Sequence, residues 1–265
     1  MIKEKQVFGT CEWATDNANF ISGCIHNCKY CYSKEMAIRF KRKTIENWTV
    51  EEINHKQLNK KFNKKDGYIM FPSSHDISPD NLKYSLVFLN NLLEKGNHIL
   101  IVTKPHLSVI KEICDKYKSH KKNILFRFTI GSCKTETLRF WEPNAPSFEE
   151  RLSSLKYAYE LGFTTSVSCE PILDIEINEL IDKILPFVND AVWIGKPNFL
   201  LRRLKMNGIK DKETIKRAEE LSKKQSDTWV LDIYDFFKDN TKIKWKESIK
   251  KIVNIEIPTT KGLDK

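Results

Sequence analysis

Long apolar runs are missing from this sequence. No stretch approaches the roughly 18 apolar residues that a membrane-spanning helix needs. The N-terminal segment MIKEKQVFGTCEW has neither an apolar stretch of about 7–15 residues nor a small-residue cleavage site, so nothing in it predicts export. With 40% hydrophobic and 30% charged residues, the composition is typical of a globular protein. We therefore expect a soluble, cytoplasmic protein with no membrane partner.

Repeats and linkers are also missing. No low-complexity block or Pro/Gly-rich segment divides the 265 residues. Short β-rich runs instead alternate with longer helical patterns, which is typical of βα units around a parallel sheet. Strands are predicted at residues 19–22, 68–72, 98–103, 124–130, 164–169 and 191–194. Helices are predicted at residues 33–41, 50–62, 80–94, 107–117, 148–161 and 177–187.

Six βα units are too few to close an eight-stranded barrel. We therefore predict an α/β fold, a partial (βα)6 barrel whose strand C-termini face a common cleft where ligands bind. The pattern changes after Lys196, where residues 202–224 predict a basic helix and residues 229–239 an amphipathic one. We expect a core domain at residues 1–200 and a C-terminal helical extension at residues 201–265, packed on that core.

Cysteines are few and odd in number, seven in all, which disfavours a disulfide framework. Cys24, Cys28 and Cys31 fall within one short segment, as expected for metal binding. The other four are more often small buried residues than catalysts. They are Cys11, Cys114, Cys133 and Cys169.

Basic residues outnumber acidic ones by 45 to 35, which gives a formal net charge of +10. Such an excess is found in proteins that bind nucleic acid or anionic substrates. Lysine is nevertheless spread along the whole chain, with runs at residues 60–65 and 118–122. A compositional bias and a nucleic-acid surface therefore both stay open.

The segment GCIHNCKYCYS places its cysteines at positions i, i+4 and i+7. A loop with this spacing can wrap three thiolates around three irons of a 4Fe-4S cluster and leave the fourth iron without a protein ligand. That iron can chelate S-adenosylmethionine (SAM), and an electron from the cluster then breaks the S–C5′ bond to give a 5′-deoxyadenosyl radical. The alternative is a zinc knot, which needs four ligands, with His26 as the fourth.

The C-x3-C-x2-C pattern, with Tyr30 before its last cysteine, resembles the signature of the radical SAM superfamily. GCIHNCKYCYS, IVTKPHL and WEPNAPSFEERL resemble, in order and spacing, the spore-photoproduct-lyase-like branch. The resemblance covers roughly residues 17–200. It implies a 4Fe-4S cluster and SAM as cofactors, and a low-potential electron donor of the flavodoxin or ferredoxin type.

Residue by residue, the resemblance implies that Cys24, Cys28 and Cys31 bind the cluster. It also implies that Tyr30 or Tyr32 lies by the adenine of SAM, although Tyr30 would equally suit the core. The polar run Ser73, Ser74, His75 and Asp76 after the second strand corresponds to the segment that holds the SAM amino group. A simple turn is the alternative there.

Polar residues also follow the later strands. Lys104 is expected to pair with the SAM carboxylate or a ribose hydroxyl, unless it is only a solvated lysine. Ser168 and Glu170 end the fifth strand, and Lys196 and Asn198 follow the sixth, where a polar ligand would provide partners for these groups. We assign catalytic roles to Lys104, Glu170 and Lys196, a cofactor contact to Ser168 and a substrate contact to Asn198. A structural Glu170–Lys196 ion pair is the alternative.

Three further residues are weighed as substrate contacts. Arg127 alternates with two phenylalanines and contacts a ligand only if its face of the strand is the barrel interior. A deazaguanine base would need a carboxylate for its N–H groups and a stacked ring, which Asp232 or Glu170 and Phe20 could supply. Glu142, directly before the first proline of WEPNAPS, is interpreted mainly as part of a structural corner.

The motif leaves the substrate open, and three hypotheses follow. The first is a lyase that removes a side chain from a modified nucleobase, with queuine salvage to 7-aminomethyl-7-deazaguanine as the best candidate. The second is DNA or RNA repair or modification of the photoproduct lyase type, but His75 stands where photoproduct lyases carry a hydrogen-donating cysteine. Cys133 or Cys169 could replace that thiol only if the fold brings one into the cleft. The third is a metal-binding module without catalysis.

Overall fold

The computed structural model describes residues 6–262 and contains a seven-stranded parallel sheet. The strand order is β1-β4-β5-β6-β7-β8-β9, so strands next to each other in the sheet follow each other along the chain, apart from a separate β2–β3 pair. Because every neighbouring pair is parallel, all the carboxyl ends meet at one edge. The prediction of a partial α/β barrel is confirmed.

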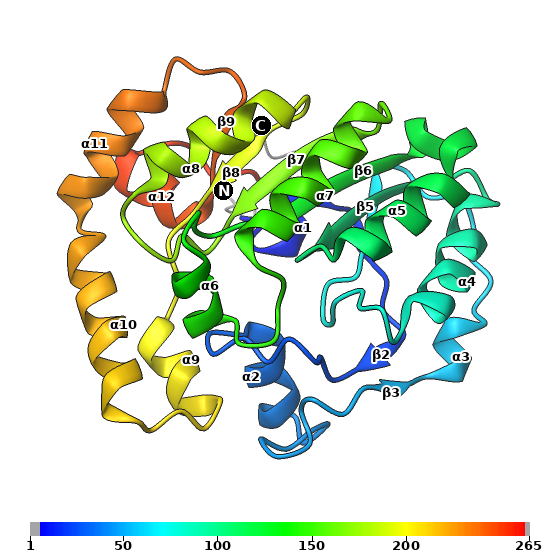
Figure 1. Cartoon of the computed structure of the whole chain (residues 1–265), viewed down its shortest axis with the longest axis horizontal. Coiled ribbons are helices and arrows are strands. Elements are labelled where there is room, and N and C mark those ends of the chain that lie inside the picture. Colours follow the sequence, from blue (N-terminus) through cyan, green and yellow to red (C-terminus); the bar gives the residue numbers. More distant parts are fainter. Residues whose placement is uncertain (1–5, 263–265) are drawn as a thin grey trace, which may run out of the picture.

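The strands are short, and their bounds are as follows: β1 Asp16–Asn17, β2 Ile21–Ser22, β3 Glu52–Ile53, β4 Tyr68–Phe71, β5 His98–Thr103, β6 Ile124–Thr129, β7 Thr164–Cys169, β8 Val192–Ile194 and β9 Ile243–Trp245. The α-helices are α1 Thr10–Trp13, α2 Tyr32–Arg39, α3 His55–Leu58, α4 Leu82–Leu93, α5 Leu107–Lys116, α6 Thr135–Trp141, α7 Phe148–Glu160, α8 Ile177–Ile184, α9 Leu200–Met206, α10 Lys212–Lys224, α11 Asp227–Phe237 and α12 Glu247–Val253. Figure 1 shows α4, α5, α7 and α8 around the outside of the sheet and α9 to α11 along one side.

Alternation along the strands separates the two faces of the sheet. Phe71, Ile101 and Phe126 belong to the large core that joins sheet and helices, whereas Met70 and Leu125 form a smaller cluster inside the barrel. The partly buried ring of Trp13 in α1 packs against this inner cluster. The N-terminal segment thus fills the barrel interior beneath the cleft.

Two strand predictions need correction. Residues 19–22 are not in the large sheet, because β2 pairs antiparallel with β3 and the two-residue β1 takes the first place. Residues 243–245 form β9 beside β8, so the chain after residue 200 is not purely helical and adds the last strand of the sheet.

Two helix predictions were also wrong. Residues 50–62 contain β3 and only one helical turn, α3, whose N-terminus is capped by Asn54 through a hydrogen bond from the Gln57 amide. The long helix expected at residues 202–224 divides into α9 and α10. It breaks at Gly208, which adopts φ 82°, and a Cβ there would lie 2.8 Å from the Ile45 side chain. No helix within residues 6–262 is both long and apolar enough to cross a membrane.

Candidate functional site

A cavity of about 470 Å³ opens at the carboxyl edge of the sheet. Its lining includes the cysteine loop, the segments that follow β4, β5, β7 and β8, and part of α1. A volume of this size is typical of small-molecule sites. The ends of parallel strands therefore converge on one concave site, as the sequence predicted.

All three cysteines of the motif line this cavity, and none forms a disulfide. Cys31 is the N-cap of α2, and its sulfur accepts a hydrogen bond from the Lys34 amide at 3.4 Å. Burial raises the pKa of the Cys28 thiol to about 12, although Lys104 opposes this shift. A bound metal would favour the thiolates that burial disfavours.

The cysteine loop fits a cluster better than a zinc knot. Across the described chain, no three His, Cys, Asp or Glu side chains converge on a point where one metal ion would bind. A cubane needs no such point, because each thiolate binds a different iron. The Nδ1 and Nε2 atoms of His26 lie 3.1 Å from Asp76 Oδ2 and 3.3 Å from His106 Nε2. The ring of His26 is therefore engaged away from the sulfur atoms.

The loop enters the site through Gly23, whose φ of 101° suits glycine. A Cβ there would lie 2.5 Å from the Val50 carbonyl oxygen and 2.8 Å from that of Trp48. The next residue, Cys24, donates its amide hydrogen to the Trp48 carbonyl oxygen at 3.0 Å. A glycine at this position thus lets the cysteine loop approach residues 48–50.

The motif WEPNAPS forms hydrogen bonds with the cysteine loop. The Lys29 amide donates to the Trp141 carbonyl oxygen, and Asn144 Nδ2 donates to the Ile25 carbonyl oxygen, each at 2.9 Å. From α9, Asn207 Nδ2 donates to the carbonyl oxygens of Lys29 and Cys31 at 2.9 and 3.0 Å. Hydrogen bonds with these distant segments thereby fix the backbone of the cysteine loop.

Glu142 lies at the centre of a buried charge group. Its carboxylate accepts hydrogen bonds from Arg151 and from the Tyr30 hydroxyl, and it lies 3.7 Å from Lys104 Nζ. Burial would raise the pKa of Glu142, but the Arg151 and Lys104 charges outweigh it and lower that pKa. Glu142 thus joins the structural corner to two cavity residues, Tyr30 and Lys104.

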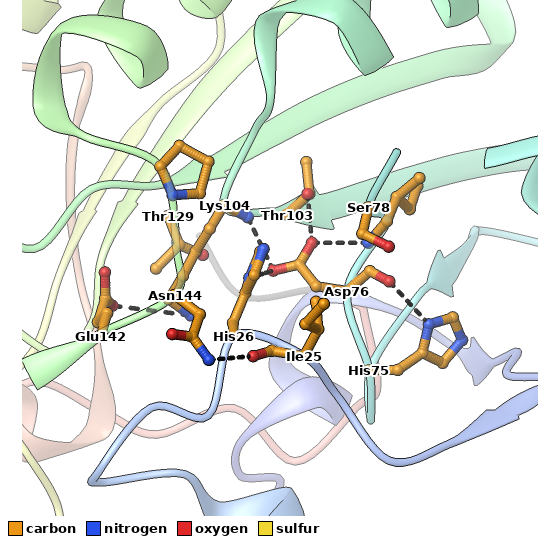
Figure 2. A network of polar contacts seen from close by, with 12 residues as sticks. Ile25, His26, His75, Asp76, Ser78, Thr103, Lys104, Thr129, Glu142 and Asn144 are labelled. Carbon is orange, nitrogen blue, oxygen red and sulfur yellow. Dashed lines mark hydrogen bonds and ion pairs between the residues drawn. The ribbon is translucent and has the colours of Figure 1, made fainter. Parts of the chain in front are cut away.

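Asp76 organises the ends of β4 and β5 (Figure 2). Its carboxylate accepts hydrogen bonds from the Thr103 hydroxyl and from the backbone amides of Ile77 and Lys104. Burial would raise the pKa of Asp76, but the adjacent His26 holds it well below its usual range. Asp76 belongs to the polar run that the resemblance assigns to SAM binding, but nothing in the sequence predicts this central position.

His75 lines the cavity and has one unpaired ring nitrogen. Its Nδ1 lies 3.1 Å from the Asp76 carbonyl oxygen, and because a carbonyl only accepts, Nδ1 carries the proton. Its Nε2 is buried without a hydrogen-bond partner in the described structure. Burial lowers the pKa of His75 to about 4, so the ring is neutral at pH 7. Nε2 is thus a hydrogen-bond acceptor.

Ser73 and Ser74 also line the cavity, as do Tyr32 and Ser168. Asn19 Oδ1 accepts hydrogen bonds from the Ser73 and Ser74 amides at 2.8 and 3.0 Å. The Tyr32 hydroxyl donates to the Ser73 carbonyl oxygen. This run is therefore held in place by the segment between β1 and β2 and by α2.

The opposite wall contains Glu170, Lys196 and Asn198, which line the cavity. The suggested Glu170–Lys196 ion pair is wrong, because Glu170 lies 3.6 Å from Lys246 Nζ and Lys196 Nζ lies 3.9 Å from Asp227. Lys246 also pairs with the buried Glu12 at 2.7 Å. Neither Glu12 nor Lys246 belongs to a sequence motif, so neither was predicted as a site residue.

Three predicted substrate contacts lie outside the lining. Phe20 packs in the core against Phe71 and Phe88. Arg127 does face the barrel interior, but it is buried between the rings of Trp13 and Trp193 and bonds to Ser166 and Asp190. Asp232 is exposed on α11. The cavity lining likewise excludes Cys133 and Cys169, so the fold does not bring either thiol into the cleft.

Comparisons with known proteins agree with this geometry. The family model of the radical SAM superfamily matches residues 18–188. An uncharacterized protein of Methanocaldococcus jannaschii is 29% identical over 171 residues, which are 63% of this chain and 64% of that protein. An uncharacterized protein of Acidianus two-tailed virus is 27% identical over 58% of this chain and 54% of its own length. The chain thus matches less than two thirds of either relative.

Two solved structures share the fold. SuiB of Streptococcus suis bound to SAM has a TM-score of 0.52 at 14% identity, over 94% of this chain and 54% of SuiB. A spore photoproduct lyase mutant with bound SAM and dinucleoside spore photoproduct has a TM-score of 0.52 at 16% identity, over 80% of this chain and 66% of the lyase. The chain belongs to the radical SAM superfamily, and its cofactors are a 4Fe-4S cluster and S-adenosylmethionine.

Proposed function

We propose that Cys24, Cys28 and Cys31 hold the 4Fe-4S cluster and that SAM binds beside it in the cavity. The observation that carries this proposal is that the three buried or half-buried thiols line one cavity with the polar ends of β4, β5 and β7. When bound and reduced by one electron, these two groups supply a 5′-deoxyadenosyl radical. The chain's own residues position the cofactors and the substrate around it.

We propose SAM contacts on the cysteine side of the cavity. Ser73, Ser74 and His75 are fixed by Asn19 and Asp76 and offer a carbonyl, hydroxyls and an acceptor nitrogen. Such groups suit the ammonium of SAM. Lys104, whose charge Glu142 stabilises, would pair with the carboxylate. Tyr30, Tyr32 and Ser168 complete this set as contacts of the nucleoside part.

We propose further that the enzyme is a lyase that cleaves a side chain from a modified nucleobase, with queuine as the first substrate to test. The cavity of about 470 Å³ must hold SAM and the substrate, so a small base fits better than a polymer. Glu170 and Asn198, on the wall opposite His75, offer an acceptor and a donor to the base. Lys196 lies beside them and would stabilise negative charge.

Photoproduct repair is a weaker candidate. The photoproduct lyase likeness is one of fold, and His75 stands in place of its donor cysteine. The lysine runs at residues 60–65 and 118–122 immediately precede β4 and β6. They therefore lie at the amino edge of the sheet, opposite the cavity, where they cannot hold a duplex over the site.

We propose residues 1–200 as the catalytic core and residues 201–265 as the extension that closes it.

The test is an anaerobic assay of iron-reconstituted protein with SAM, dithionite and queuine, read by mass spectrometry. We expect 7-aminomethyl-7-deazaguanine to form together with 5′-deoxyadenosine. If deoxyadenosine forms while queuine stays intact, the queuine proposal fails and the radical SAM activity stands. Thymine photoproducts and peptides are then the next substrates, in line with the lesion and the precursor peptide bound in the structural neighbours.

A further inference from the structure

The segment that follows α2 presents apolar side chains to solvent close to the cysteine loop. Phe40 is 58% exposed, Val50 is 56% exposed and Ile45 is 43% exposed. They lie within eleven residues, and the turn folds back on α2 through bonds from the Arg42 and Lys43 amides to the Ala37 carbonyl oxygen. We call residues 39–50 the loop patch.

The loop patch is also basic. Arg39, Lys41 and Arg42 are exposed, and none of the three forms an ion pair with an acidic side chain of residues 6–262. The guanidinium carbons of Arg39 and Arg42 lie 5.7 and 5.9 Å from the centroid of the Phe40 ring. Glu46 is the one acidic residue of the segment. The side chains around the apolar centre therefore carry a net positive charge.

The inner side of the loop patch touches the proposed cluster ligands. Trp48 is 2% exposed and packs with Cys24, Ala37 and Cys31. Its carbonyl oxygen accepts the Cys24 amide hydrogen at 3.0 Å. Lys43 extends inward and donates to the Val50 carbonyl oxygen at 2.8 Å, which fixes the turn. The loop patch therefore contacts Cys24 and Cys31 through Trp48.

Other surfaces fit a charged partner less well. The pocket between α6, the segment before α8 and α10 has three basic and three acidic side chains in its lining, so its charge balances. They are Lys134, Arg217, Lys224, Asp174, Glu176 and Glu220. The lysine runs before β4 and β6 are at the wrong edge of the sheet. The loop patch alone among these three joins net positive charge to contact with the cysteines.

We propose that the loop patch is the docking surface for an acidic electron carrier of the flavodoxin type, an inference that rests on the proposed cluster site. Opposite charges steer such partners together, and small interfaces are typical of electron-transfer complexes. The exposed Phe40 ring suits the apolar edge of a flavin. In the complex the reduced flavin anion loses one electron and the oxidised cluster gains it, with no proton transferred.

The experiment measures binding of a purified, strongly acidic flavodoxin to the iron-reconstituted full chain at low and high salt. The double variant R39Q/R42Q should weaken binding at low salt by at least about tenfold, because two attractive charges are lost. The control K121Q/K122Q makes the same charge change at the opposite edge and should bind as the wild type does. Phe40→Ser should weaken binding a few-fold and keep the salt dependence.

Activity separates docking from chemistry. R39Q/R42Q should keep full iron content and full dithionite-driven deoxyadenosine formation, but its flavodoxin-driven reaction should slow by about tenfold. Equal weakening in both double variants would overturn the proposal, and so would binding of an acidic ferredoxin but not flavodoxin at the patch. A dimer of this chain that R39Q/R42Q abolishes would also overturn it. A failed queuine assay affects none of these binding results.

Discussion

The two walls of the cavity are built in different ways. The cysteine wall comprises the cysteine loop, the segment after β4, Lys104 and the Glu142 corner. Hydrogen bonds join these motifs to one another. The closing wall comprises Glu170, Lys196 and Asn198. Behind Glu170 lie Lys246, its ion-pair partner Glu12 and the rings of Trp13 and Trp193. This ion pair joins residues 234 positions apart. Sequence motifs form the cysteine wall. The closing wall forms only when the segments around Glu12 and Lys246 come together.

This difference suggests separate duties. On the cysteine wall, buried charges contact Tyr30 and lie close to Cys28, so a change there reaches the proposed cluster directly. Behind the closing wall, Lys246 lies 4.0 Å from the centroid of the Trp13 ring and ties the N-terminal segment to β9. We expect the first wall to control cofactor retention and the second to control stability and substrate access.

The largest effect is expected at the cysteines. Cys28→Ala removes one of three thiolates, and two cannot hold the cluster, so iron content and deoxyadenosine formation should both be lost. Iron analysis and mass spectrometry check this. Cys133→Ala is the matched control, since that thiol lies outside the cavity lining, and it should keep both. Retention of iron in Cys28→Ala would contradict the cluster assignment.

Glu142→Gln should be the most destabilising change on the cysteine wall outside the cysteines. It leaves the fully buried Arg151 without its charge partner, and breaking such a pair costs about 3–5 kcal/mol. Denaturant unfolding of the iron-free protein measures the loss. Iron retention should also fall, because Trp141 and Asn144 of the same corner anchor the loop.

The control for Glu142→Gln is Glu136→Gln, on the exposed face of α6. It makes the same chemical change without burial and should alter stability by no more than about 0.5 kcal/mol. If the two variants unfold alike, the buried charge group contributes nothing measurable.

The same contrast explains how far the sequence alone could go. The bounds of β5 and β7 were predicted without error because both are β-rich runs between clear helical patterns. The two-residue β1 and three-residue β9 carry too little pattern to be found. Residues 50–62 have helical apolar spacing, but Asn54 and Asn59 bracket a single turn. The start of that segment forms β3 instead, because it pairs with β2 in the folded chain.

At the site, the cysteine wall was largely predictable and the ion pair behind the closing wall was not. Cys24 belongs to the cysteine motif, whereas His75 and Lys104 follow strands of the large sheet, and strand ends converge in a parallel sheet. Glu12 and Lys246 carry no local signal, because an ion pair between the two ends of the chain depends on where β9 and α1 are placed. Phe20 was misplaced because a two-residue strand pattern does not say which face a ring takes.

Lys246→Met should separate the two walls. It removes Lys246 from its buried ion pair with Glu12, and we expect a loss of about 3 kcal/mol, low in the range for a broken buried pair. The loss is limited because Glu12 keeps a hydrogen bond from the Gly9 amide at 2.7 Å. Iron content should stay at the wild-type level, unlike that of Glu142→Gln.

The double variant E12Q/K246M provides the internal control. Removal of both charges should restore about 1 kcal/mol or more relative to Lys246→Met, because the buried Glu12 charge is removed together with that of Lys246. If Lys246→Met loses as much iron as Glu142→Gln does, the two walls act as one unit and do not have separate roles.

The smallest effect is expected at His75, the buried residue proposed to contact SAM. His75→Phe keeps the edge-on packing against Phe20 and Phe71 but removes the acceptor Nε2. A ligand N–H that faced this atom would then lie buried without a partner, at a cost of about 1–2 kcal/mol. His75→Gln places an amide oxygen within reach of the same region and should recover most of that loss. Affinity for SAM by equilibrium dialysis and KM for substrate, measured on both variants with normal iron content, identify which ligand donates the hydrogen bond. Equal affinities and equal KM values in the wild type and His75→Phe would mean that Nε2 meets no ligand, and His75 would then belong to the core rather than to the cysteine wall.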